Sequence, residues 1–283
     1  MIGLGKLGLE AIAALADSKT SETTLLALSQ DEADLRQSKA DVGILLSSDQ
    51  RELMTRDNLD QIKHALEDFD VCFIVAACRN ASEQRALVTI SNFAHELDAF
   101  LIGWLRGSFE CNESQKEPGL REDGSFLKTL ADKFSIISVP PQPQNDTVDQ
   151  ATIIALCNHI EALSGLISQP GLIGVDYVDV RAILKAKGIV LAGMGQAFGE
   201  NRVTEAFAAA LSDSMFSSSK FGVVEGLLLN VIGGQNVGMT ELETASRLAG
   251  SQIGTNANVL VGITSDPTCV DEIRVQLMLT GLN

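Results

Sequence analysis

The chain has 283 residues, 45% of them hydrophobic, and a formal net charge of −16. This composition is typical of a globular protein with a large core, and the length favours two domains or one domain with a substantial second lobe. The acidic charge argues against a surface for duplex nucleic acid or anionic membrane, because both are bound by clustered Lys and Arg.

The cysteines and histidines further narrow the classes of protein that this sequence could encode. The five cysteines form no C-x-x-C pair, and their odd number favours a reducing compartment with mostly buried thiols. His64, His95 and His159 are far apart in helix-like segments, so we expect helix-surface histidines and no metal site. No basic leader precedes an apolar segment, and no apolar run reaches membrane-spanning length without a charge or turn. These features predict a cytoplasmic protein that does not insert into a membrane.

The first motif is G-x-G-x-x-G, formed by Gly3, Gly5 and Gly8 between a short apolar run and an amphipathic helix. Such glycines permit a tight turn and let a helix N-terminus approach a pyrophosphate, as in NAD-binding Rossmann proteins. An NAD-binding protein also needs an acidic residue at the end of the second strand. Ser29 and Gln30 stand there instead, so NAD binding is the least favoured of the alternatives.

The first half alternates β-rich runs with helical patterns, which indicates a parallel sheet with crossover helices. A loop-like stretch at 107–125 interrupts this pattern. The expected strands are 24–29, 71–77, 100–105 and 134–140, and the expected helices are 56–69 and 82–99.

A long helical pattern from Val148 to about Ser168 should bridge the two halves. The second half ends on two strand patterns with no helix between them, which implies a mixed sheet. We expect strands at 188–197, 224–234, 258–265 and 272–282, with helices at 201–212 and 240–251.

The segment from Pro170 to Leu282 resembles FtsZ of the tubulin superfamily, over "GVDYVDVRAILKAKGIVLAGMGQAFGENRV", "VEGLLLNVIGGQNVGMTELETAS" and "DEIRVQLMLTGL". The resemblance implies an α/β fold in three parts. A Rossmann-like GTP-binding domain (1–147) has a parallel sheet, a central helix (148–170) follows, and a smaller mixed-sheet α+β domain (171–283) completes the chain. Under this resemblance, Gly3, Gly5 and Gly8 are vestiges of the family's first phosphate loop.

The phosphate loops depart from the family pattern. The loop G-G-G-T-G-T-G aligns with Arg79–Arg85, where no glycine is left. Glycine brings backbone N–H groups onto phosphate oxygens, so their loss argues against phosphate binding. Glu83 and Glu10 add negative charge at this site, which Lys6, Arg79 and Arg85 could offset.

Other nucleotide contacts of the family also have no counterpart here. The γ-phosphate loop of A-G-A-N-P type is absent after "GILLSSDQRELM", and the loop around Cys111 replaces the sugar-side segment. Ile153 and Ile154 stand where polar readers of guanine are expected, and isoleucine cannot hydrogen-bond a base. We therefore expect no bound cofactor and no catalytic residue; GTP or GDP with Mg is the alternative.

The resemblance assigns Asp176 and Asp179 to the family loop that reaches the nucleotide of a neighbouring subunit. Helix capping alone would also explain both residues, because Asp176 precedes a predicted helix and Asp179 falls in its first turn.

The favoured interpretation is an FtsZ-like protein without normal GTP binding or hydrolysis. It would form nucleotide-independent head-to-tail filaments or dimers, with Lys6, Arg79 or Arg85 of one subunit meeting Asp176 or Asp179 of the next. It could instead modulate the filaments of a nucleotide-competent FtsZ. The alternative is a GTP-dependent polymerising GTPase with a rearranged pocket.

Overall fold

A computed structural model divides the chain into two compact units, Met1–Cys157 (unit 1) and Asn158–Asn283 (unit 2). The boundary falls inside the long helix, so the three-part division at residues 147 and 170 stays a prediction. The structure describes residues 1–18, 23–47, 54–78, 80–106, 126, 130–139, 148–168, 173–185, 189–213, 224–253 and 257–281.

Unit 1 is built on six parallel strands in the order β3-β2-β1-β4-β5-β6. The strands are β1 (Ile2–Leu4), β2 (Leu26–Ser29), β3 (Val42–Leu45), β4 (Val71–Ala76), β5 (Phe100–Arg106) and β6 (Ser135–Val139). The helices are α1 (Gly5–Leu15), α2 (Glu32–Gln37), α3 (Arg56–Glu67) and α4 (Ala81–Glu96), and α6 (Gln150–Ser168) continues into unit 2.

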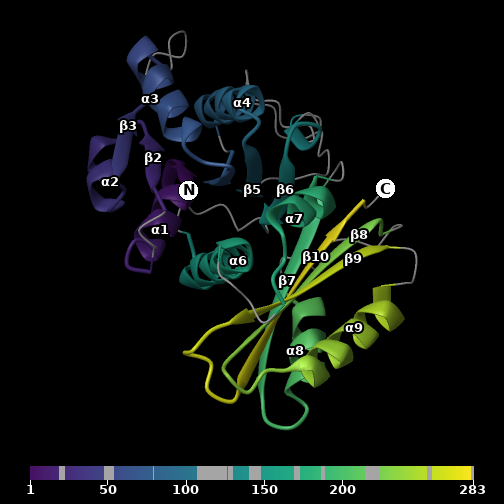
Figure 1. Ribbon diagram of the computed structural model, residues 1–283. Helices are drawn as coiled ribbons and strands as arrows, with labels where there is room; N and C mark the ends of the chain where they lie inside the picture. The colour runs from purple at the N-terminus through teal and green to yellow at the C-terminus, as the bar shows by residue number, and fades with distance from the viewer. Residues whose placement is uncertain are drawn as a thin grey trace, which may run out of the picture. The chain divides into compact units, whose positions relative to one another are not determined.

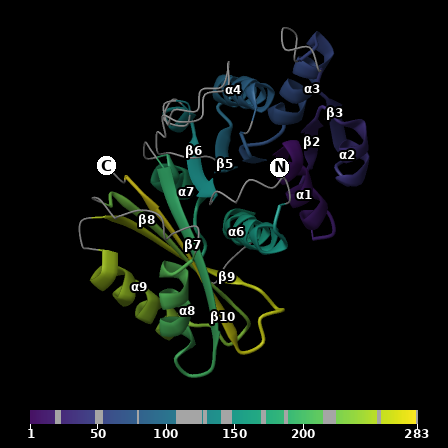
Figure 2. The ribbon, with the colours of Figure 1, turned by 180° about the vertical axis from the view of Figure 1, so that it is seen from behind.

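Both faces of this sheet are buried, which explains the nearly continuous apolar strands. Leu26 and Leu28 join the core under α3 and α4, whereas Leu25 and Ala27 point to the face covered by α1. The views from both sides show α1 across the strands from α3 and α4 (Figure 1 and Figure 2). Alternate residues of one strand therefore serve two helical layers.

Unit 2 has a mixed sheet in the order β7-β10-β8-β9, in which β10 runs antiparallel to β7 and β8, while β8 and β9 are parallel. Phe207 of the amphipathic helix α8 lies in the core that this sheet forms with α8 and α9. The strands are β7 (Ile189–Phe198), β8 (Gly226–Gly233), β9 (Asn258–Ser265) and β10 (Glu272–Thr280), and the helices are α7 (Tyr177–Leu184), α8 (Arg202–Leu211) and α9 (Met239–Ile253).

The α/β class, the parallel first sheet and the mixed second sheet are confirmed, and the expected strands lie within about two residues of their predicted bounds. The sequence pattern does not predict α2 and β3. Both are short, and α2 has no buried residue, so neither produces an amphipathic pattern. The predicted loop at 107–125 lies outside the described residues.

His159 corrects the expectation that all histidines are on helix surfaces. Its side chain is fully buried, with Nε2 3.3 Å from Asp213 Oδ2, and Gln276 Nε2 donates to its backbone oxygen at 2.9 Å. In the same layer, Asn230 Nδ2 donates to the Ala162 oxygen at 3.2 Å. These bonds tie the second half of α6 to β8 and β10, and buried polar groups need such partners.

The helix α6 is long and apolar enough to pass a length and composition criterion for membrane spans. Core helices of soluble proteins pass the same criterion, and Leu156 and Leu163 of α6 are fully buried in the protein. The helix is therefore explained by its packing, and it is weak evidence for a membrane span.

Close packing of α1 depends on glycine. A Cβ atom on Gly8 would overlap the carbonyl oxygen of Val75 in β4, and one on Gly3 would overlap the backbone of Gly8. Neither neighbour is a flexible side chain that could move away. These two glycines are explained by the approach of α1 to β1 and β4.

We predict that Gly8→Ala lowers the free energy of unfolding by about 1–3 kcal/mol, because the backbone must shift to accept the methyl group. Gly250→Ala is the control, since Gly250 lies in α9 with open space around its Cα. That variant should gain about 0.5–1 kcal/mol from helix propensity. Urea unfolding monitored by circular dichroism measures both, and equal stability of the two variants would contradict this packing explanation.

Candidate functional site at the carboxyl edge of the unit 1 sheet

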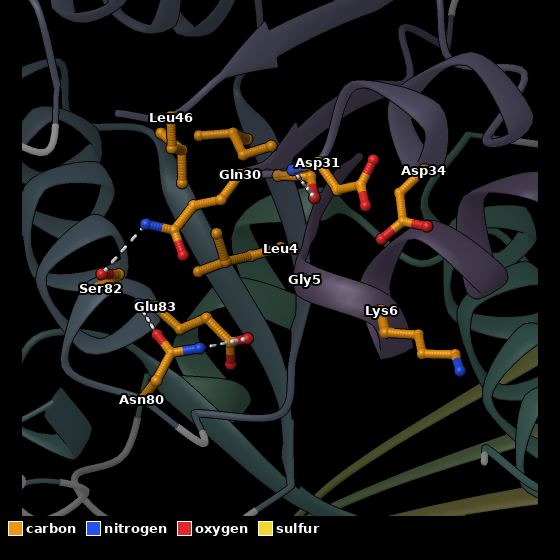
Figure 3. A pocket seen from close by; sticks show the side chains of 12 residues that line it. Leu4, Gly5, Lys6, Gln30, Asp31, Asp34, Leu46, Asn80, Ser82 and Glu83 are labelled. Carbon is orange, nitrogen blue, oxygen red and sulfur yellow. Dashed lines mark hydrogen bonds between the residues drawn. The ribbon is translucent and has the colours of Figure 1, made fainter. Parts of the chain in front are cut away.

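A pocket of about 260 Å³ opens at the carboxyl ends of β1, β2 and β3, where open α/β sheets place their ligands (Figure 3). Leu4, Leu28 and Leu46 form its buried apolar part. Residues from the end of β2 and from the starts of α1, α2 and α4 complete it. These are Gly5, Lys6, Ser29, Gln30, Asp31, Asp34, Asn80, Ser82 and Glu83.

Of the three glycines of the first motif, only Gly5 lines the pocket. It begins α1 with φ of +64°, a conformation that favours glycine. A Cβ atom on Gly5 would lie 2.5 Å from Oε1 of Glu83, so the carboxylate occupies the space where a side chain would be. The start of α1 therefore faces the Glu83 carboxylate.

The segment that aligns with the family's phosphate loop is a capped helix start. Asn80 is the N-cap of α4: its Oδ1 accepts from the Glu83 backbone N–H at 2.8 Å, and its Nδ2 donates to Glu83 Oε1 at 3.2 Å (Figure 3). Gln30 Nε2 donates to the Ser47 oxygen at 2.9 Å and to Ser82 Oγ at 3.4 Å. Side chains thus bridge the end of β2 to α4.

The charges around the pocket are mostly negative. Asp31, Asp34 and Glu83 contribute three carboxylates, and Lys6 contributes the one ammonium group in the described lining. Arg85 is exposed on α4 and does not line the pocket, and Arg79 lies outside the described residues. In the described ranges, no three His, Cys, Asp or Glu side chains form a group that could hold a metal ion.

A second group of charges involves α1, the end of β5 and the start of α6. Burial raises the pKa of Glu10, while Lys6 and Arg106 act to lower it. Arg106 is only 5% exposed, and it also helps to lower the pKa of Asp149, for which the Thr152 hydroxyl is the main cause. Arg106 therefore favours the charged form of both carboxyl groups, although burial outweighs this effect at Glu10.

The start of α6 carries no base-reading side chain at the two predicted positions. Ile153 is buried, and Ile154 is 52% exposed. Asp149, just before them, accepts hydrogen bonds from the Ala151 N–H at 2.7 Å and the Thr152 hydroxyl at 2.8 Å. The sequence analysis missed Asp149 and Arg106, although a charged residue at the end of a buried strand could have drawn attention to Arg106.

In unit 2, Asp176 caps α7, because its Oδ1 accepts from the Val178 N–H at 3.0 Å. Asp179 follows in the first turn, and both carboxylates are exposed. Between them, Val178 is 63% exposed. An isolated bridge between Ile173 and Ile263 leads the chain along β9 to α7. The capping interpretation thus holds for Asp176, and Asp179 remains available to a partner.

Comparisons with known proteins agree with this architecture. The family profile "FtsZ family, C-terminal domain" matches residues 188–283. A curated cell division protein FtsZ of Coxiella burnetii is 29% identical over 233 residues, covering 79% of this chain and 60% of that protein. The chain thus spans about 60% of that relative's length.

Two solved structures share the fold. An empty FtsZ dimer of M. jannaschii superposes with a TM-score of 0.80 at 21% identity, covering 100% of this chain and 88% of that one. A GTPγS-bound protofilament of CetZ2 from Haloferax volcanii has a TM-score of 0.72 at 16% identity, covering 100% and 92%. At such identities, the likeness establishes the fold.

The raised pKa of Glu10 gives a pH-dependent prediction. Folding favours its protonated form, so this contribution is present below the ordinary value of 4.5 and is lost as pH rises through the folded-state pKa. Glu10→Gln should therefore be slightly more stable than the natural chain at pH 7, with a smaller difference at pH 4. Thermal unfolding at both values measures this, with the exposed Glu205→Gln on α8 as control. An advantage that grows on acidification would be inconsistent with burial as the main cause.

Proposed function

The chain belongs to the FtsZ/tubulin superfamily, and from this premise we propose that it is an FtsZ-like cytoskeletal protein that assembles head to tail without binding or hydrolysing GTP. The observation that carries the proposal is the charge of the pocket at the carboxyl edge of unit 1. Among the described residues, three carboxylates and one ammonium group line it. A nucleotide phosphate chain is itself multiply negative, so the pocket repels the ligand that this position holds in nucleotide-binding relatives.

The size of this repulsion can be compared with that of single hydrogen bonds. Two unit charges 4 Å apart interact by about 4 kcal/mol at the effective dielectric of a protein surface. Lys6 offsets one of the carboxylates, which leaves two. At that dielectric, the repulsion from two carboxylates exceeds what a few hydrogen bonds of about 1 kcal/mol each contribute.

The nucleoside side supports the same proposal. Arg106 influences the ionisation of both Glu10 and Asp149, so charged groups of the protein itself interact at the start of α6. A base or ribose bound beside them would have to remove water from these charges, which opposes binding. Ile153 and Ile154 offer no hydrogen bond in return.

The start of α7 supplies a surface for a second copy. Val178, in the first turn of α7, is 63% exposed. Asp179 follows it with an exposed carboxylate. We assign most of the binding energy to apolar contacts such as that of Val178, and give the register to pairs between Asp179 and the Lys6 or Arg85 of the next subunit. Because such contacts repeat in one direction, they produce a filament.

A second candidate function is modulation of a nucleotide-competent FtsZ. The observation that favours it is the difference between the two surfaces: Asp176 and Asp179 are retained and exposed at the start of α7, whereas the phosphate pocket is acidic. A subunit of this kind could dock on a filament through α7 and offer the next subunit a poor site, which would stop growth.

We predict that the purified protein gives no saturable heat with GTP and Mg²⁺ in titration calorimetry up to about 1 mM nucleotide, which corresponds to binding weaker than about −4 kcal/mol. The protein is first freed of nucleotide by dialysis against EDTA. Saturable binding in the micromolar range would overturn the proposal and favour the alternative of a GTP-dependent polymerising GTPase.

We also predict that Asp179→Lys raises the concentration needed for assembly by about tenfold, the effect of roughly 1.4 kcal/mol. Glu205→Lys is the matched control, since Glu205 is likewise an exposed acid in the first turn of a helix. Combining Asp179→Lys with Lys6→Glu should restore part of the loss. Sedimentation at several concentrations measures all four proteins, and equal behaviour of the two single variants would exclude the charge pairing.

A further inference from the structure

We propose that β9 is a docking strand for a second copy of this chain, which pairs with it edge to edge and antiparallel around a twofold axis at Leu260. The contact uses β9 of unit 2 on both sides and no residue of the unit 1 pocket. It goes beyond the head-to-tail contact proposed above, because it joins two copies through identical surfaces and closes on itself.

The backbone on the outer side of β9 is available for pairing. β9 is the last strand of the sheet, and its inner side pairs with β8. The Asn258 N–H donates to the Glu225 oxygen at 2.8 Å, so the even-numbered residues of β9 direct their N–H and C=O groups to β8. The odd-numbered residues Val259, Val261 and Ile263 direct theirs outward. Such an edge is a template for another strand.

One end of this edge already carries an antiparallel segment. Ile173 forms an isolated antiparallel bridge with Ile263. Among the described residues, this is the one bridge on the outer side of β9, and it does not extend to Val259 or Val261. The Val259 side chain is 46% exposed. The edge therefore accepts antiparallel chain at its end and is open near its beginning.

The edge also lacks the features that usually prevent such pairing. Natural sheet edges are commonly protected by charged side chains, proline or a bulge. Residues 248–265, which include β9, contain no charged side chain and no proline, although 20% of the chain is charged. In a protein with a net charge of −16, two copies can approach along this strand without like charges meeting at the contact.

The sequence of β9 favours a second copy as the partner strand. Val259, Leu260 and Val261 read the same in both directions, as an antiparallel pair of identical strands requires. With the axis at Leu260, Val259 of each copy is opposite Val261 of the other, and their outward N–H and C=O groups exchange hydrogen bonds. Val261 packs against the unit 2 core, so the exposed Val259 gains an apolar neighbour on the same face.

Disulfide crosslinking tests this register. Leu260 faces its own copy as a non-hydrogen-bonded pair with Cα atoms about 4.5 Å apart, which a disulfide can span. Asn258 is the matched control on the same strand, since its two copies are four residues apart along the pair, roughly 14 Å. On oxidation with copper phenanthroline at equal protein concentration, Leu260→Cys should give about tenfold more crosslinked dimer than Asn258→Cys. The natural chain, with its five cysteines, gives the background.

A second pair of variants tests the backbone hydrogen bonds. Proline is tolerated on an edge strand where the lost N–H faces outward, as at position 259. Added to Leu260→Cys, Val259→Pro should lower the crosslinked dimer about tenfold, the effect of roughly 1.4 kcal/mol. Val259→Thr keeps the N–H and the branched shape, so it should leave crosslinking unchanged. Melting followed by circular dichroism checks the fold, and Val259→Lys replaces Val259→Pro if the latter does not fold.

Three results would overturn the inference. Equal crosslinking of Leu260→Cys and Asn258→Cys would indicate random collision. Crosslinking that survives both Val259→Pro and Val259→Lys would exclude strand pairing. No crosslinked dimer above the natural chain would exclude a second copy and leave the edge to an extended segment of another protein. The GTP titration and the Asp179→Lys assay do not involve β9, so this inference and the proposed function can fail separately.

Discussion

The close approach of α1 to the parallel sheet is the constraint on which the rest of unit 1 depends. Gly3 and Gly8 leave no room for a Cβ atom between β1, α1 and β4, and this fixes where α1 begins. Its first residue, Gly5, then lies against the carboxylate that α4 provides. A motif that suggests a cofactor loop is thus explained by helix packing and by an internal anion.

The proposed contact joins two surfaces, the pocket of unit 1 and the start of α7, and both carry net negative charge among their described residues. The described lining of the pocket carries more carboxylates than cations, and the start of α7 carries two exposed carboxylates. Two acidic surfaces repel each other, so in the proposed contact Lys6 and Arg85 set the register while apolar contacts such as that of Val178 supply affinity. A protein with a net charge of −16 can self-associate only where such local exceptions occur. This is why the assembly should depend more on salt and single charges than on nucleotide.

The sequence predicts the fold well because most of its strands and helices have a clear pattern of apolar and polar residues. Buried strands such as β4 and β5 appear as apolar runs, and α8 has a clear amphipathic face. The short elements α2 and β3 carry too few residues for a period to emerge. The fully buried His159 could not be anticipated either, since its partners Asp213 and Gln276 are 54 and 117 residues away in the chain.

The candidate site, like the fold, could be predicted only in part from the sequence. A negative charge from Glu83 near the phosphate position follows from the sequence comparison, but its contact with Gly5 depends on how α4 packs beside α1. Arg106 and Asp149 were missed because their relation to Glu10 is a tertiary one. Asp176 was open to two interpretations, and its capping bond is a local feature that the pattern did predict.

The most direct measurement is negative-stain electron microscopy of the protein stripped of nucleotide and metal, beside an identical sample given GTP and Mg²⁺. A pocket whose described lining is acidic predicts the same filaments, at the same protein concentration, in both samples. Filaments that form only with GTP would contradict it, because the nucleotide would then supply a contact that Glu83 and its neighbours do not.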